Sequence, residues 1–234
     1  MNIEPRTDWT LKQGVPIGPQ LYRILRERIV SADLPPGSRI SESEVARTYS
    51  LSRQPVREAF IKLAEDGLVE VRPQRGTLVR KISPDAVMDA RFVREAIEAD
   101  IVKLVAENVD EGLVRTLQDQ IARQRALPDS EAEAFLALDE RFHRTLADAA
   151  GKSYAWKVIE DVKLQMDRVR YLSALHFSKR ELVIQHSAIA DAIIRRDPEG
   201  AAQAMRTHLR KILTDLPTIA ATRPDFFETA ERGR

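Results

Sequence analysis

The stretch SLSRQPVREAF, residues 50–60, decides the fold of the first part of the chain. Ser52 is a good helix cap, because its hydroxyl can accept a hydrogen bond from the free N–H groups of a first helical turn. Pro55 then falls within that turn, where a missing N–H costs little. Val56 and Phe60 stand four residues apart and share one face of the helix, which we expect to be buried.

Two arginines lie beside that face. Arg53 and Arg57 are four residues apart, so their side chains lie one above the other near the start of the helix. A helix that reads the major groove of DNA needs this layout, since its N-terminal end meets base edges and phosphates. An ordinary amphipathic helix with solvated arginines would show the same pattern, so the flanking sequence has to decide.

The flanking segments complete a winged helix-turn-helix. One helix is predicted ahead of the stop signal LPPG at residues 34–37, and a second begins at the capping box SESE at residues 41–44. After the stretch, residues 69–79 alternate like two short strands around a turn with Arg75 at its tip. Gly76 would let the backbone bend there and approach a phosphate. Three helices and a basic hairpin wing indicate a module that binds double-stranded DNA.

The composition is that of a soluble globular protein. The chain contains 43% hydrophobic and 31% charged residues and no cysteine, which excludes disulfides and thiolate metal sites. No apolar run approaches the roughly 20 residues of a membrane span, and the N-terminus lacks the apolar core of a signal peptide, so we expect a cytoplasmic protein without membrane contact. Residues 17–81 hold 12 Lys and Arg against 8 Asp and Glu, whereas residues 82–234 hold 23 against 26. The positive part coincides with the predicted DNA-binding module.

The N-terminal segment resembles the DNA-binding domain of GntR-family bacterial transcription regulators. The resemblance is carried by ISESEVA at 40–46, LSRQPVREA at 51–59, EDGLV at 65–69 and RGTLV at 75–79. It implies that the recognition helix and the wing contact operator DNA, and that the start of the preceding helix approaches the DNA backbone. Gln54 stands where the family usually has threonine. The candidate DNA-contacting residues are Ser43, Glu44, Ser52, Arg53, Gln54, Arg57, Arg75 and Gly76.

The rest of the chain is expected to be helical, so that the fold is mainly α. Six helices are predicted at 84–107, 110–127, 131–150, 153–175, 179–196 and 198–215. Their short connections imply antiparallel neighbours and hence an all-α bundle. The predicted organisation is a flexible arm at 1–16, a winged helix-turn-helix at 17–81, a helical domain at 84–216 and a mobile tail at 217–234, in which only Phe226 and Phe227 could dock locally.

Four side chains with metal-binding chemistry fall on or beside the apolar faces of these helices. His186 and His208 lie within the apolar stripes of the fifth and sixth helices, and Asp139 and His143 lie at the edge of the stripe of the third. A single inward histidine is more often a hydrogen-bonded core residue. A buried unpaired carboxylate is costly, however, and a divalent metal would satisfy all four groups at once. Without cysteine, Zn²⁺, Ni²⁺ and Mn²⁺ all remain open.

Arg94, Glu98 and Arg170 extend this site as candidate effector-binding residues. Arg94 and Glu98 fall among the apolar positions of the first body helix. Arg94 either forms a structural ion pair with Glu98 or holds the carboxylate of a small ligand in a bidentate manner. Arg170 shares a face with apolar residues of the fourth helix and could reach the pocket, with a solvated position as the alternative.

Residues 84–216 resemble the FCD-type ligand-binding domain of the FadR group within the GntR family. The segments that carry this resemblance are RxxxE at 94–98, DERFH at 139–143, HSAI at 186–189 and HL at 208–209. The resemblance implies that Asp139 and the three histidines hold a divalent metal, and that open metal positions and an arginine bind a carboxylate effector. Six helices instead of seven is similar to the VanR-like subgroup.

These features predict a ligand-responsive transcription regulator, specifically a repressor, and not an enzyme. Such a protein would bind palindromic operator DNA as a homodimer, because the two-fold symmetry of the operator mirrors that of the protein. A small anionic metabolite would bind above the metal. Two alternatives remain open: a metal-dependent, hydrolase-like enzyme with a DNA-binding head, and a metal sensor or structural metal site without an organic effector.

Overall fold

A computed structural model describes residues 10–12, 14–72 and 76–229 of the chain. The chain divides into two compact units. The N-terminal part through Ser83 and the C-terminal part from Arg223 together form the first unit, and residues 84–222 form the second. In the described residues, no helix is long and apolar enough to cross a membrane.

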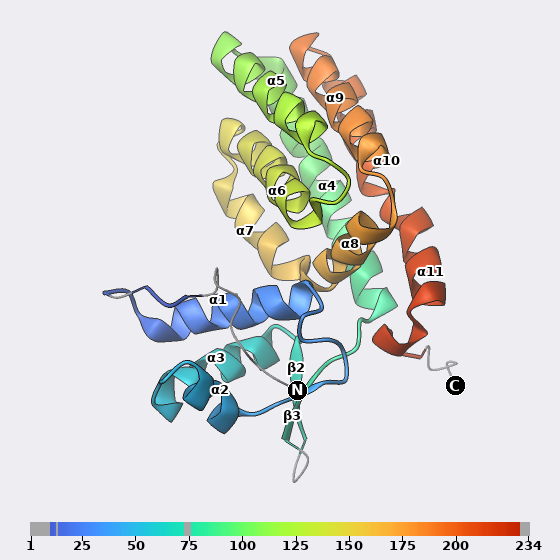
Figure 1. Cartoon of the computed structure of the whole chain (residues 1–234). Helices are drawn as coiled ribbons and strands as arrows, with labels where there is room; N and C mark the ends of the chain where they lie inside the picture. Colours follow the sequence, from blue (N-terminus) through green and yellow to red (C-terminus); the bar gives the residue numbers. More distant parts are fainter. Residues whose placement is uncertain (1–9, 13, 73–75, 230–234) are drawn as a thin grey trace. The chain divides into compact units, whose positions relative to one another are not determined.

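Three helices form the core of the first unit, namely α1 (Ile17–Val30), α2 (Glu42–Thr48) and α3 (Arg53–Glu65). Both α1 and α2 pack against α3 (Figure 1), as expected for a helix-turn-helix. The apolar face of α3 is buried, with Val56 at 0% and Phe60 at 3% exposure. Ser41 and Ser52 occupy the N-cap positions of α2 and α3 as predicted, but neither hydroxyl makes a capping hydrogen bond.

A small antiparallel sheet forms the wing. It contains β1 (Arg39–Ile40), β2 (Val69–Arg72) and β3 (Gly76–Val79) in the order β1-β3-β2. The hairpin of β2 and β3 was predicted, whereas β1 was not, because two residues are too few to show an alternating pattern. Gly76 has a φ of +83°, a conformation that a residue with a Cβ rarely adopts. The turn with Arg75 lies outside the described residues.

A mobile tail was predicted from residue 217, but residues 217–227 form regular structure. Helix α11 (Ile212–Thr222) is followed by the short 3₁₀ helix η1 (Pro224–Phe226). The backbone of Ile82 then pairs in parallel with Phe227: Ile82 N donates to Phe226 O at 2.8 Å, and Glu228 N donates to Ile82 O at 2.9 Å. Phe226 and Phe227 are each 4% exposed, so both rings belong to the core of the first unit.

Only part of the predicted N-terminal arm can be described. Residues 1–9 and 13 lie outside the described residues. The segment just before α1 is held by Gln20, whose Oε1 accepts from the backbone N of Lys12 at 2.7 Å. Its Nε2 donates to the backbone oxygen of Val15 at 3.0 Å. Lys12 and Val15, in the predicted flexible arm, therefore contact α1, and the flexibility of the arm stays a prediction.

The second unit is entirely helical. Its helices are α4 (Pro84–Asn108), α5 (Glu111–Ala126), α6 (Ala132–Ala149), α7 (Ser153–Val162), α8 (Leu164–His176), α9 (Arg180–Ile194), α10 (Pro198–Leu209) and α11 (Ile212–Thr222). We predicted six helices here, and the structure has eight. The fourth predicted helix is divided at Lys163, where ψ is −2° and the buried ammonium pairs with Glu140 and Asp167. The sixth is divided at residues 210–211 and continues as α11.

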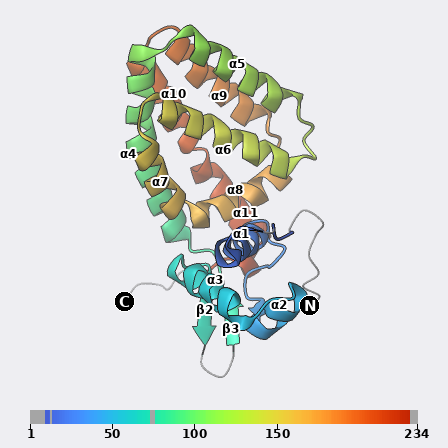
Figure 2. The same cartoon turned by 90° about the vertical axis from the view of Figure 1, so that its left-hand side faces the viewer.

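The longest helix, α4, runs along the whole bundle in both views (Figures 1 and 2). Helix α10 packs against α4 and α9, while α5 packs against α6 and α9. The core between them is apolar, with Phe135, Phe142 and Ile189 at 0% exposure. The polar side chains considered next interrupt this core from α4, α6, α9 and α10.

Candidate metal centre and DNA-contacting residues

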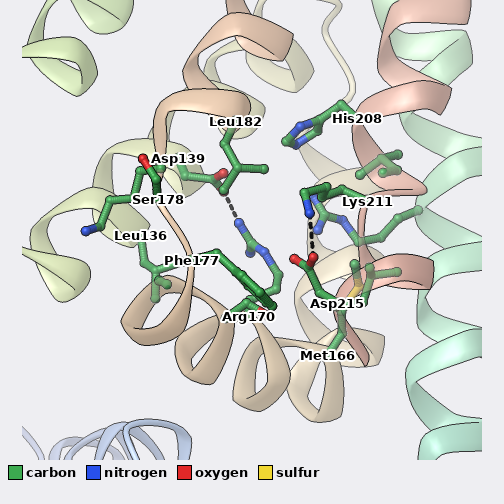
Figure 3. A pocket seen from close by; sticks show the side chains of 16 residues that line it. Leu136, Asp139, Met166, Arg170, Phe177, Ser178, Leu182, His208, Lys211 and Asp215 are labelled. Carbon is green, nitrogen blue, oxygen red and sulfur yellow. Dashed lines mark hydrogen bonds and ion pairs between the residues drawn. The ribbon is translucent and has the colours of Figure 1, made fainter. Parts of the chain in front are cut away.

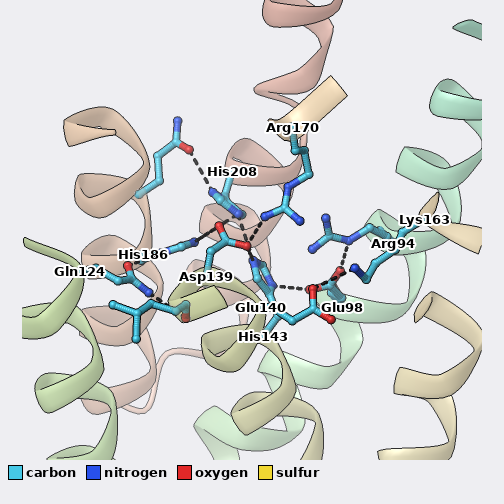
Figure 4. Close-up of polar contacts among 12 residues, drawn as sticks. Arg94, Glu98, Gln124, Asp139, Glu140, His143, Lys163, Arg170, His186 and His208 are labelled. Carbon is cyan, nitrogen blue, oxygen red and sulfur yellow. Dashed lines mark hydrogen bonds and ion pairs between the residues drawn. The ribbon is translucent and has the colours of Figure 1, made fainter. Parts of the chain in front are cut away.

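The four predicted metal ligands come together in the interior of the second unit (Figure 4). Asp139 and His143 come from α6, and His186 and His208 come from α9 and α10. All four are buried, and one potential ligand atom of each lies within 4.8 Å of the others. Their inward direction was predicted from the sequence, because their positions follow the 3.6-residue period of the apolar residues around them.

The facing atoms of this cluster have the spacing of ligands around one ion. Nε2 of His208 lies 3.1 Å from Nε2 of His143 and 3.3 Å from Nε2 of His186. Oδ1 of Asp139 lies 3.5 Å from Nε2 of His186. Ligands bound at about 2 Å from a common ion are about 3 Å apart.

Behind the cluster, each imidazole places its other ring nitrogen against a side-chain oxygen. Nδ1 of His186 lies 2.7 Å from Oε1 of Gln124, and Nδ1 of His208 lies 3.1 Å from Oε1 of Gln185. Nδ1 of His143 lies 2.5 Å from Oε2 of Glu98. Because an amide oxygen accepts, the ring proton of His186 and of His208 is expected on Nδ1. Their Nε2 atoms lie 3.3 Å apart, and neither can then donate to the other.

The electrostatics of the cluster also suit a cation. Burial lowers the pKa of His186 to about 3, and burial together with the neighbouring histidines lowers the pKa of His208 well below its usual value. Burial alone would raise the pKa of Asp139, but the charge of Arg170 outweighs burial and holds this pKa well below its usual range. Oδ1 of Asp139 is buried without a hydrogen-bond donor among the described residues. Neutral imidazoles and a carboxylate are a donor set that divalent metals accept, so these residues fit such an ion.

A cavity adjoins this cluster (Figure 3). Its volume is about 50 Å³, enough for a few water-sized groups. Asp139 and His208 belong both to the cluster and to the cavity wall, and Arg94 and Arg170 line the same wall. The buried Arg94, the mostly buried Arg170 and two candidate metal ligands therefore face one space.

Arg94 is 1% exposed and pairs with Glu98, which is 2% exposed, through Nε and Oε1 at 2.6 Å. Glu98 in turn contacts His143 with its second oxygen. Burial would raise the pKa of Glu98, but Arg94 and His143 outweigh it and lower the pKa to about 2. Among the described residues that line the cavity, Arg94 is present and Glu98 is not. The predicted effector contact of Glu98 is therefore unsupported, because both of its oxygens are directed at protein groups.

Arg170, on α8, points into the cavity and not into solvent, with a side chain that is 15% exposed. Its Nη2 donates to Oδ2 of Asp139, and its Nη1 donates to Oδ1 of Asp167 at 3.3 Å. The alternative of a solvated arginine is thereby excluded. Its guanidinium lies next to a predicted metal ligand.

The candidate DNA-contacting residues that the structure describes lie on α2, at the start of α3 and on β3. Arg53, Gln54 and Arg57 are exposed, on the side of the helix away from its buried face. In the described part of the chain, neither arginine forms an ion pair, whereas Gln54 donates to Glu58 at 3.0 Å. Ser43 and Ser52 are exposed and Glu44 is half-buried; Gly76 starts β3, and Arg75 lies outside the described residues.

Sequence reasoning missed three side chains near these sites. Gln124 lies one heptad beyond the buried Leu117 on α5, and a polar residue on that apolar face was the available signal. Gln185 is half-buried and directly precedes His186 on α9, and this position was the available signal. Arg39 is exposed on β1, and its Nε lies 2.9 Å from where a Cβ on Gly76 would be, so it adds a cation beside the wing.

A winged helix-turn-helix with exposed arginines on its third helix, joined to a helical unit with a buried candidate metal site, indicates a DNA-binding regulator. Comparison with known families supports this class. Residues 18–79 match the family described as bacterial regulatory proteins, gntR family, and residues 89–211 match the FCD domain. The chain belongs to the gntR family of bacterial transcription regulators that carry an FCD domain, as predicted.

Curated relatives of this chain are also transcription regulators. The HTH-type transcriptional repressor RspR of Escherichia coli K12 is 41% identical over 214 residues, which cover 91% of this chain and 94% of that protein. A probable D-xylose utilization operon transcriptional repressor of Paenarthrobacter nicotinovorans is 26% identical over 197 residues, which cover 84% of this chain and 87% of that protein.

Among solved structures, a putative GntR regulator from Rhodococcus sp. RHA1 has a TM-score of 0.70 at 25% identity and covers 86% of this chain and 97% of that one. Escherichia coli McbR/YncC has a TM-score of 0.72 at 18% identity and covers 87% of this chain and 98% of that one. At this identity the likeness supports the fold alone. The predicted fold class is confirmed.

Proposed function

We propose that this regulator is a repressor whose helical unit binds a divalent metal ion and a small carboxylate effector, which together control operator binding. The observation that carries the proposal is the buried group of Asp139, His143, His186 and His208 beside a cavity with two arginines. The repressor role is proposed because RspR and the D-xylose operon regulator, two relatives of this chain, are named as transcriptional repressors.

The metal would be held by Nε2 of the three histidines and by the carboxylate of Asp139. When bound, the ion would supply a Lewis-acidic positive charge for an anionic ligand. The protein supplies the rest. It keeps two of the imidazoles neutral by burial, and keeps the carboxylate charged through Arg170. Zn²⁺, Ni²⁺ and Mn²⁺ all accept this donor set.

The effector would be a carboxylate because Arg94 and Arg170 are buried in the wall of the cavity. A guanidinium has five N–H donors and binds a carboxylate through two parallel hydrogen bonds. In Arg94 the Nε–H is directed at Glu98, which leaves the two terminal amino groups for a ligand. Hence Glu98 would orient Arg94 without touching the effector.

The DNA-binding unit would place α3 in the major groove of a palindromic operator, with two copies of the chain acting as a homodimer in the cytoplasm. Arg53 and Arg57 support this, because both are exposed near the N-terminal end of α3 and, in the described residues, are free of ion pairs. Ser52 and Gln54 lie beside them at the start of α3, Gly76 begins β3 of the wing, and all three would add contacts.

Elemental analysis and thermal unfolding test the ligand site. The purified protein should contain about one divalent ion per chain, and removal by a chelator should lower the melting temperature. A concentration of metal at 100 times its Kd stabilises a folded protein by about 2.7 kcal/mol.

Carboxylic acids should raise the melting temperature further, and only in the metal-loaded protein. A protein that binds no metal would overturn the proposal. A protein that binds metal but no carboxylic acid would point to a metal sensor. The hydrolase alternative has little support, since its candidate base Glu98 faces Arg94 and His143 and the relatives are regulators.

A further inference from the structure

Two glutamines contact the outer ring nitrogens of His186 and His208, on the side away from the cluster. Gln124 lies on α5 and is 1% exposed. Its Oε1 is 2.7 Å from Nδ1 of His186, and its Nε2 donates to the backbone oxygen of Leu138 at 3.3 Å. A backbone carbonyl only accepts hydrogen bonds, so the NH₂ end of this amide must face Leu138 and the oxygen must face the imidazole.

The second glutamine repeats this arrangement from a different helix. Gln185 lies on α9, and its Oε1 is 3.1 Å from Nδ1 of His208. Its Nε2 donates to Oε1 of Glu181 at 3.3 Å. A carboxylate oxygen also only accepts, so this amide too is oriented with its oxygen toward the ring.

An amide oxygen at Nδ1 determines which nitrogen of the imidazole carries the proton. The neutral ring has one N–H, and the hydrogen bond to the oxygen keeps it on Nδ1. Nε2 then has a free lone pair. Nε2 of His186 and Nε2 of His208 lie 3.3 Å apart on the side of the cluster that faces Asp139.

We propose that Gln124 and Gln185 are positioning residues of the metal centre, because their amide oxygens fix His186 and His208 with the proton on Nδ1 and keep both Nε2 atoms ready to bind a divalent ion. The inference rests on the proposed metal binding of the cluster. The third ring, His143, has the carboxylate of Glu98 in the equivalent place.

The choice of amides has an electrostatic consequence. Asp139 and Glu98 are balanced by their partners Arg170 and Arg94 in the buried site. A neutral amide orients its histidine without adding another buried negative charge, so the charge of a bound divalent ion is not neutralised from behind the ligands. That excess positive charge is left for an anionic effector.

The test compares variants of Gln124 and Gln185 that lack the amide oxygen with a control variant of another buried glutamine. Gln124→Leu and Gln185→Leu keep the approximate side-chain size and remove the acceptor. Gln120→Leu is the control, because Gln120 is also buried on α5, at 4% exposure, but donates to Thr145 at 2.8 Å. Gln185→Glu is the conservative variant, because it keeps an acceptor oxygen at this half-buried position.

Zn²⁺ affinity, measured by competition with a chromophoric chelator, should fall about 10- to 100-fold in Gln124→Leu and in Gln185→Leu. Gln120→Leu and Gln185→Glu should bind Zn²⁺ within about threefold of the wild-type protein. Equal Zn²⁺ affinity in the wild type and in both test variants would overturn the proposal, as would an equal loss in Gln120→Leu.

Long-range ¹H–¹⁵N correlation spectra of the metal-free, ¹⁵N-histidine-labelled chain provide a second measurement that does not depend on metal. His186 and His208 should carry the proton on Nδ1 in the wild type, and each should lose this preference when its own glutamine is replaced. A proton on Nε2 of either ring in the wild type would overturn the inference, even if a leucine variant fails to fold. A wild type that shows the expected tautomers but binds no Zn²⁺ would refute the proposed metal site and leave the orienting role supported.

Discussion

Replacing Arg94 by methionine tests whether this residue stabilises the fold, binds the effector, or does both. Arg94 and Glu98 are 1% and 2% exposed, and Nε lies 2.6 Å from Oε1. Removing one partner of such a buried ion pair leaves an uncompensated charge and costs about 3–5 kcal/mol. Here Glu98 keeps a second contact to His143 at 2.5 Å, so we expect a loss near 3 kcal/mol.

The double variant Arg94→Met, Glu98→Leu separates the two roles, since it removes both charges. A buried ion pair replaced by apolar side chains of similar size is often no less stable than the pair. Much of the loss in the single variant should therefore be recovered. Carboxylate binding should not recover, because the guanidinium that faces the cavity is absent from both variants.

Urea unfolding followed by circular dichroism gives the stability of each protein, and titration calorimetry of the metal-loaded protein gives the carboxylate affinity. A single variant as stable as the wild type would refute the buried-charge reasoning. Wild-type carboxylate affinity in either variant would refute the role of Arg94 in effector binding and leave a structural ion pair.

Three further predictions concern other parts of the chain. Arg57→Ala should weaken operator binding by about 1–3 kcal/mol if the arginine reads a base, and an unchanged footprint and affinity would refute that role. His143→Ala should lose bound metal by elemental analysis while α1 to α3 stay folded, and full metal content would remove it from the ligand set. Phe226→Ala should destabilise the first unit by about 3–5 kcal/mol, because its ring is only 4% exposed; unchanged hydrogen exchange in α1 and α3 would show that the C-terminal segment does not support this unit.

The winged helix-turn-helix was predictable because its signals are local. Turn residues, a capping sequence and short alternating segments mark its helices and its hairpin in order along the chain. The inward direction of His186 and His208 was also predictable, because helical periodicity alone places a residue on a buried face.

What could not be predicted depends on contacts between distant residues. The pairing of Ile82 with Phe227 joins segments that are far apart in the sequence and has no signal in either segment. The break at Lys163 lies within a continuous helical pattern, and only the ion pairs of its buried ammonium mark the place. Glu98 appeared to face a ligand, because periodicity shows that a residue points inward but not which buried group it meets.

The central claim is that the metal-bearing pocket controls DNA binding. Its most direct test is the operator affinity of the metal-loaded protein with and without an active carboxylic acid, compared with His208→Ala under the same conditions. We predict that the acid changes the operator affinity of the wild type by a factor within the usual allosteric range of about 5–150, and leaves His208→Ala unchanged. An equal change in the variant, or no change in the wild type with any acid that binds it, would contradict the account.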